Sequence, residues 1–319
     1  MFFIINYFNK RKRMKERESL PEFPEELRQT LGMRLKEGDP LAGKLEQAWN
    51  KQMAGSVKER LIGKGALSSQ EYEWYELELK RFFCMTAIMK NVPMYSAKVD
   101  AIWHDMILFT KDYSEFCERF NGAMIHHTPT EKASKTNHSI RHERALYELV
   151  YSVLFDFHAG SEQIQGPFGN SLLNREFILE CEELRGQELE RYIEQTLFKA
   201  DVSQHGELIC AASRQIARQL ITAKERLVTS GSAAPLSKSK SGIAASDQAL
   251  FLLLYTSMEA AHEPEEEEND SAAGYACSGY DGRRYDDDRN GSHHDSDSSN
   301  CSSDSGGSSC SSCGGGCSS

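Results

Sequence analysis

The sequence predicts an all-α multi-helix globular domain followed by a disordered acidic C-terminal tail rich in Ser, Gly and Cys. Between residues 20 and 228, apolar side chains recur at helical spacing in most segments. The same residues contain no convincing alternation of apolar and polar side chains and no hairpin turn between such runs, so the sequence does not predict strands. From Glu263 onward, large aliphatic side chains are almost missing. That segment therefore cannot bury enough apolar surface to offset its ordering entropy.

Composition divides the chain into five segments. We expect a flexible basic segment at 1–19, the helical domain at 20–228 with a core motif at 70–130, a linker at 229–246, a short helix at 247–262 and the tail at 263–319. The net charge is −11, and the residues from Pro264 onward account for −9 of it. The nearly neutral body lacks the basic surface that phosphate binding needs, so we expect no nucleic-acid partner.

The segment at 68–90 gives the strongest helix signal. Ser68 and Glu71 have the spacing of a capping box, and Pro93 stops the helix. Ser96 is a predicted cap for the next helix, which carries an apolar stripe through Trp103. Further stripes predict helices at 21–60, at 146–157 ending near Gly160, at 177–198, at 208–227 and at 249–258.

A third central helix follows closely. Thr110 is its predicted cap, and Gly122 fits a left-handed C-terminal cap. Its apolar stripe contains Tyr113, Phe116, Cys117 and Phe120.

These central helices carry the residues with the richest chemistry. Asp100 and His104 are four residues apart and share one helix face, so the carboxylate can orient the imidazole. His126 and His127 follow the Gly122 turn. If the chain folds back there, His104, Cys117, His126 and His127 can converge on one ion, and Cys/His sets suit Zn²⁺. Two alternatives stay open: a metal-free polar cluster that locks three helices, and metal-free catalysis by His104 with Asp100.

One family resemblance is carried by these same residues. The pattern combines Val99-Asp100-x-x-Trp103-His104, Thr110-x-x-Tyr113-x-x-Phe116-Cys117 and Gly122-x-x-x-His126-His127-x-Pro129. It resembles the glycine-rich domain-containing protein-like family, whose domain has no established reaction. The resemblance implies that Trp103, Thr110, Tyr113, Phe116, Gly122 and Pro129 are structural motif residues. Some plant relatives carry an RNA-binding segment, but this sequence has no matching motif.

The tail contributes a second set of thiols. Cys301, Cys310, Cys313 and Cys317 can bind soft metals, although Gly and Ser supply nothing that would fold around an ion. Scattered body cysteines without an export signal favour a cytoplasmic location, and no segment is apolar enough to span a membrane.

Three functional hypotheses follow. We favour a cytoplasmic interaction or regulatory module with an unidentified protein partner and an open oligomeric state. The second hypothesis is an enzyme that depends on zinc or a similar metal ion, with hydrolysis as the candidate reaction. Its metal site would be the cluster of His104, Cys117, His126 and His127. The third is a thiol metal buffer in the tail.

Overall fold

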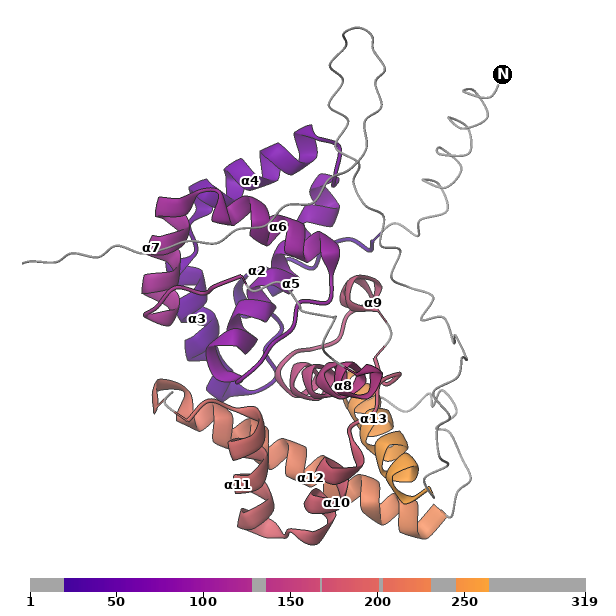
Figure 1. Cartoon of the computed structure of the whole chain (residues 1–319). Coiled ribbons are helices and arrows are strands. Elements are labelled where there is room, and N and C mark those ends of the chain that lie inside the picture. Colours follow the sequence, from indigo (N-terminus) through magenta and orange to yellow (C-terminus); the bar gives the residue numbers. More distant parts are fainter. Residues whose placement is uncertain (1–19, 128–135, 167, 201–202, 231–244, 264–319) are drawn as a thin grey trace, which may run out of the picture. The chain divides into compact units, whose positions relative to one another are not determined.

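The computed structural model describes residues 20–127, 136–166, 168–200, 203–230 and 245–263 (Figure 1). Within these ranges the all-α prediction is confirmed, because the only β pairing there consists of two isolated bridges. The elements are α2 (Leu27–Thr30), η1 (Lys36–Gly38), α3 (Asp39–Ala48), α4 (Lys51–Gly63), α5 (Ser69–Ile88), α6 (Ala97–Ile107), α7 (Thr110–Asn121), α8 (Asn137–Leu154), α9 (Ala159–Gln165), α10 (Arg175–Glu183), α11 (Gly186–Leu197), η3 (Ser203–His205), α12 (Gly206–Ser230) and α13 (Ala245–His262).

Helix α5 is the central element of the N-terminal half. The predicted capping box is present: Glu71 N–H donates to Ser68 Oγ, and Ser68 N–H donates to the Glu71 carboxylate. The helix packs against α3, α4, α6 and α9. It is buried on nearly all sides, and even Glu78 and Arg81 are fully enclosed.

Helices α6 and α7 begin and end largely as their sequences indicate. Ser96 caps α6 by accepting a hydrogen bond from Val99 N–H. Gly122 ends α7 in the left-handed region, with φ of 72°. The predicted cap at Thr110 is wrong, because Phe109 occupies the cap position and Thr110 is the first helical residue. Phe109 has no polar side-chain atom, so α7 begins without a side-chain cap.

The prediction of one helix over 177–198 is also wrong. The chain leaves the helical conformation at Leu184 and Arg185, and Gly186 then takes a φ of +51°. Glycine adopts this conformation without the steric cost of a β-carbon, so it allows the turn between α10 and α11. Helix α8 begins earlier than its apolar stripe, at a cap formed by the Thr136 side chain. The predicted end near Gly160 is wrong, because α8 ends at Leu154 and Gly160 lies inside α9.

Helix α13 packs against α8, α10 and α12 (Figure 1). Buried hydroxyl groups fix it there. Ser246 Oγ accepts a hydrogen bond from Phe157 N–H, and Ser257 Oγ accepts one from Leu173 N–H. At its first turn, Asp247 pairs with Arg34 at 2.5 Å. Every helix in the described ranges is too short or too polar to cross a lipid bilayer.

The predicted disordered tail lies outside the described residues apart from Glu263, and so do its candidate thiols Cys301, Cys310, Cys313 and Cys317. The basic segment at 1–19 and Pro129 lie outside them too. Most of the linker predicted at 229–246 also lies outside them.

Candidate functional site

Asp100, His104 and His127 meet on the surface of α6. Asp100 and His104 lie one helical turn apart, and the chain beyond α7 returns to bring His127 beside them. Asp100 Oδ1 lies 2.7 Å from His127 Nε2, and Asp100 Oδ2 lies 3.4 Å from His104 Nδ1. The centroids of the two imidazole rings are 4.3 Å apart. The sequence predicted the pairing of Asp100 with His104 and offered both His126 and His127 as residues that could join His104; of these two, His127 lies in the cluster.

A short polar chain holds the returning segment against α6. Tyr113 Oη accepts a hydrogen bond from Trp103 Nε1 at 2.8 Å and donates one to the Ile125 carbonyl at 2.7 Å. The Trp103 ring also packs against His127, with 4.5 Å between centroids. Two of the predicted structural motif residues therefore fix the position of His127.

The three side chains of the cluster differ in how much of their surface is exposed to solvent. The exposed fraction of the side chain is 57% for His104, 29% for Asp100 and 17% for His127. His104 Nδ1 lies 2.9 Å from the Asp100 carbonyl, a distance that suits donation by the Nδ1–H tautomer. In that tautomer, the lone pair of His104 Nε2 remains available to a ligand.

The donor set fits a divalent transition metal. Each of the three residues offers one ligand atom, and these atoms lie within 4.8 Å of one another. Imidazole nitrogen and carboxylate oxygen are ordinary zinc ligands. A modest approach of the three side chains would bring their atoms to coordination distance, because His104 and Asp100 are not enclosed by packing.

Two residues that the sequence analysis grouped with this site are not part of the cluster. Cys117 is fully buried on the core side of α7, and burial raises the pKa of its thiol. A higher pKa disfavours the thiolate that metal binding requires. His126 is exposed and lies outside the group formed by its neighbour His127. Phe116 lies in the core and packs against the rings of Trp49 and Phe83.

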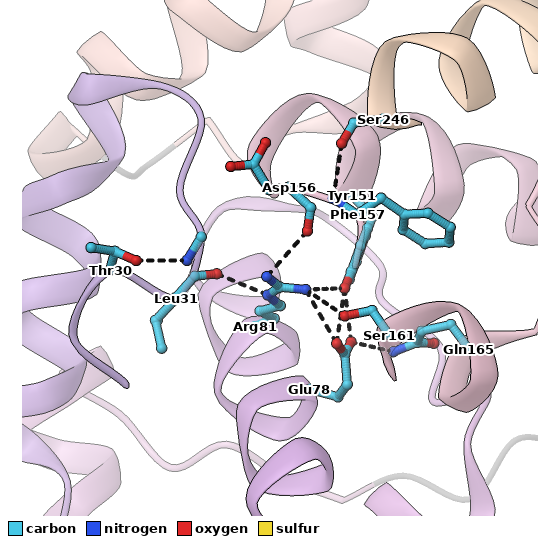
Figure 2. Close-up of polar contacts among 11 residues, drawn as sticks. Thr30, Leu31, Glu78, Arg81, Tyr151, Asp156, Phe157, Ser161, Gln165 and Ser246 are labelled. Atoms are coloured by element: carbon cyan, nitrogen blue, oxygen red, sulfur yellow. Dashed lines mark hydrogen bonds and ion pairs between the residues drawn. The ribbon is translucent and has the colours of Figure 1, made fainter. Parts of the chain in front are cut away.

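Sequence reasoning missed a second polar cluster, centred on Arg81 (Figure 2). Arg81 Nη1 donates to Glu78 Oε1 at 3.2 Å, to Ser161 Oγ at 3.0 Å and to the Tyr151 hydroxyl. Its Nε donates to the Leu31 carbonyl at 2.9 Å, and Nη2 donates to the Asp156 carbonyl at 3.2 Å. One guanidinium therefore joins the end of α2 to α5, α8 and α9.

The other members of the Arg81 cluster are equally well satisfied. Tyr151 Oη lies 2.9 Å from Glu78 Oε2, and Gln165 Nε2 donates to the same oxygen at 2.8 Å. Burial raises the pKa of Tyr151, which keeps its hydroxyl protonated and able to donate. Glu78 and Arg81 side chains have no exposed surface. The cluster is sealed, so we assign it to fold stability rather than to ligand binding.

One sequence signal could have revealed it. Glu78 and Arg81 lie three residues apart inside the apolar run that includes Leu77, Leu79 and Phe82. When apolar residues flank such a charged pair on both sides, the pattern indicates a helix that is buried on all its faces. The charged groups must then find their hydrogen-bond partners inside the protein.

Comparison with known proteins corrects the family expectation. Residues 46–150, about a third of the chain, match the model of the UCP032817-like family. That family is uncharacterised, and nothing connects the chain with glycine-rich domain proteins, so the resemblance stated from the motif was wrong. No curated protein and no solved structure matches the chain. The matched segment contains Asp100, His104 and His127, so the site lies in the part that is similar to this family.

Proposed function

We propose that this protein binds a divalent transition metal of the zinc class through Asp100, His104 and His127. The observation that carries the proposal is the approach of three ligand atoms to within 4.8 Å. Two of the three side chains are substantially exposed, which gives an ion a path to the site. Trp103 and Tyr113 hold the third ligand in place from the core side.

The direct test is titration of the full, reduced chain with Co²⁺, followed by its visible spectrum. Co²⁺ is a spectroscopic substitute for Zn²⁺ in sites of this kind. A site of imidazole and carboxylate ligands gives d–d bands alone, whereas tail thiolates add thiolate-to-cobalt charge transfer in the near ultraviolet. The spectrum thereby separates the proposed site from the alternative of a thiol metal buffer in the tail.

Variants assign the ligands. Asp100→Asn, His104→Ala and His127→Ala should each weaken binding by at least about tenfold, since even residues that only orient metal ligands have effects of that size. His126→Ala is the matched control, because His126 is an exposed histidine next to His127 and lies outside the cluster. Binding that is lost equally in the control would overturn the proposal, and so would thiolate charge transfer and d–d bands that are the same in the wild-type and His104→Ala proteins.

Hydrolysis is the second candidate, because the cluster offers three ligands and leaves a further position open. When bound at three protein ligands, zinc supplies a water molecule with a pKa of about 7. Zinc-dependent hydrolysis of an activated ester by the full chain, abolished by a chelator and by His104→Ala, would support this candidate. Equal activity in the His104→Ala variant would reject it.

The sequence favoured an interaction or regulatory module, but the exposed apolar side chains give that hypothesis less support than the metal cluster receives. They are distributed over the end of α6, the segment after α7, and helices α12 and α13. Individually exposed apolar residues are normal on protein surfaces. The large ones are Leu108, Met124, Ile221, Val228 and Leu252.

A further inference from the structure

A cleft of about 410 Å³ is lined by residues of α2, α3, α4 and α5 and by residues just before α2. None of the three proposed metal ligands lines it. Its volume is within the range of small-molecule sites, roughly 300–1,000 Å³. The cleft is therefore a second place where the chain could hold a ligand.

The apolar part of the cleft is built from buried side chains. Trp49, Tyr72 and Leu77 line it, and each has less than a tenth of its surface exposed. Tyr72 is fixed by a hydrogen bond from its hydroxyl to the Ala54 carbonyl at 3.0 Å. Because these side chains are held by the core and almost fully buried, they form a fixed floor beneath the charged groups and leave little surface of their own to a ligand.

Most charges in the cleft neutralise one another. Four carboxylates and four cationic side chains line it. Glu73 accepts from Arg28 at 3.2 Å and from Lys58 at 3.4 Å. Lys80 Nζ lies 2.6 Å from Glu46 Oε1. Arg28 also pairs with Glu25 at 2.7 Å. These pairs leave two members of the set unmatched.

The two unmatched groups carry opposite charges. Glu76 Oε1 accepts a hydrogen bond from the Trp49 indole at 2.9 Å, and no cation pairs with Glu76 among the described residues. Lys51 is exposed at the start of α4, and no carboxylate pairs with it in the same part of the chain. A half-buried carboxylate with one neutral donor keeps lone pairs for a cationic ligand group. Lys51 offers the complementary charge for an anionic group.

We propose that this cleft binds a zwitterionic ligand of dipeptide size, with its ammonium group on Glu76 and its carboxylate on Lys51, above the floor that Trp49 and Tyr72 form. The balanced lining excludes the main alternative, a polyanion such as a nucleotide. Its phosphates would meet the carboxylates of Glu46, Glu73 and Glu76 as often as the cations. A ligand with one charge of each sign satisfies both unmatched groups.

The test uses the full chain and the dipeptide phenylalanyl-leucine, with binding measured by calorimetry. Two derivatives remove one charge each: the N-acetyl form has no ammonium group, and the C-terminal amide has no carboxylate. We expect the free dipeptide to bind at micromolar to millimolar concentration. The acetylated form should bind at least about tenfold more weakly, because a charge-assisted hydrogen bond to a half-buried carboxylate is lost.

Variants then assign each end of the ligand. Glu76→Gln keeps an acceptor for Trp49, so it should fold normally, and it should bind the free and acetylated dipeptides alike. Lys51→Gln should bind the free and amidated forms alike, with a loss of about two- to fivefold because Lys51 is exposed. Glu59→Gln is the control, since Glu59 is an exposed carboxylate on α4 outside the cleft.

Three results would overturn the proposal: no binding of the free dipeptide at millimolar concentration, equal binding of all three forms, or equal losses in Glu76→Gln and Glu59→Gln. Circular dichroism of each variant separates loss of binding from loss of fold. None of these results depends on the proposed metal site, which has its own ligands and its own test.

Discussion

The two polar clusters of this protein use similar side chains in opposite ways. The Arg81 cluster is completely enclosed, and each of its groups has partners within the protein. The cluster of Asp100, His104 and His127 is partly exposed, and His104 Nε2 has no hydrogen-bond partner among the described residues. The number of polar atoms left without an internal partner, rather than residue type, therefore distinguishes a group that holds the fold from one that can bind.

Removal of the buried cation should give the largest effect. Arg81→Met leaves Glu78 as an uncompensated buried carboxylate, and we expect the free energy of unfolding to fall by about 3–5 kcal/mol. Urea denaturation followed by circular dichroism measures it. The control is Arg119→Met on α7, because Arg119 is an exposed partner of Glu115 and should cost less than about 1 kcal/mol. Equal losses in the two variants would remove the distinction between the clusters.

A change outside the Arg81 cluster should disturb it through packing. A β-carbon at Gly160 would lie 2.5 Å from the Trp74 ring, which is itself buried, so α9 and its Ser161 would have to shift. We expect Gly160→Ala to lower the free energy of unfolding by about 1–3 kcal/mol. Gly43→Ala is the opposite case, since nothing lies within 4 Å there and a helical alanine should stabilise by roughly 0.5–1 kcal/mol. A stabilising Gly160→Ala would show that α9 does not depend on this contact.

Tyr151→Phe tests the hydroxyl that joins Glu78 to Arg81. We expect a loss of about 1–3 kcal/mol in the free energy of unfolding, because two buried charged groups each lose a partner. Tyr255→Phe is the control, because the Tyr255 hydroxyl forms no hydrogen bond in the described part of the chain. This variant should change the free energy of unfolding by less than about 0.5 kcal/mol.

His104→Ala examines the exposed cluster by the same measurement. Without metal, the variant should unfold within about 0.5 kcal/mol of the wild-type protein, because more than half of the side chain is exposed. With saturating Zn²⁺, the wild-type protein should gain stability and the variant should not. A loss of 1–3 kcal/mol without metal would mean that His104 holds the helices together.

The smallest effect should appear in the pH dependence. Burial and then the nearby Arg81 lower the pKa of His158, so the folded protein binds its proton less readily than the unfolded chain. Its contribution to stability is complete above the ordinary pKa of about 6.5 and is lost as the pH falls through the lowered folded value. His158→Asn should therefore flatten the loss of stability between about pH 7 and pH 5. Part of the slope should remain, since burial also lowers the pKa of His142 and His205.

Local chemistry in the sequence was enough to predict several features of both regions. The caps at Ser68, Ser96 and Gly122 depend on residues within one turn, and the pairing of Asp100 with His104 follows from helical periodicity. The choice of His127 over His126 depends on how the chain returns after α7. No local spacing determines that path. It is set by a hydrogen bond from Tyr113 to the Ile125 carbonyl.

The Arg81 cluster could not be assembled from sequence for a related reason. Its partners are the Leu31 carbonyl, Tyr151 and Ser161, which are 50, 70 and 80 residues away along the chain. A buried arginine can be inferred from its apolar neighbours, but its acceptors become known only when the helices are placed. The burial of Cys117, in contrast, could be predicted from local sequence, because this residue lies on the apolar stripe of its helix.

The attachment of α13 has a consequence for protein synthesis. Its hydroxyl groups and Asp247 bind residues made much earlier, and its apolar side chains cover α8, α10 and α12. Translation proceeds from the N-terminus, so those three helices leave the ribosome before the helix that covers them. A nascent chain stopped before residue 245 leaves uncovered the apolar surface of α8, α10 and α12 that α13 later covers, so a chaperone can bind there until α13 has been made.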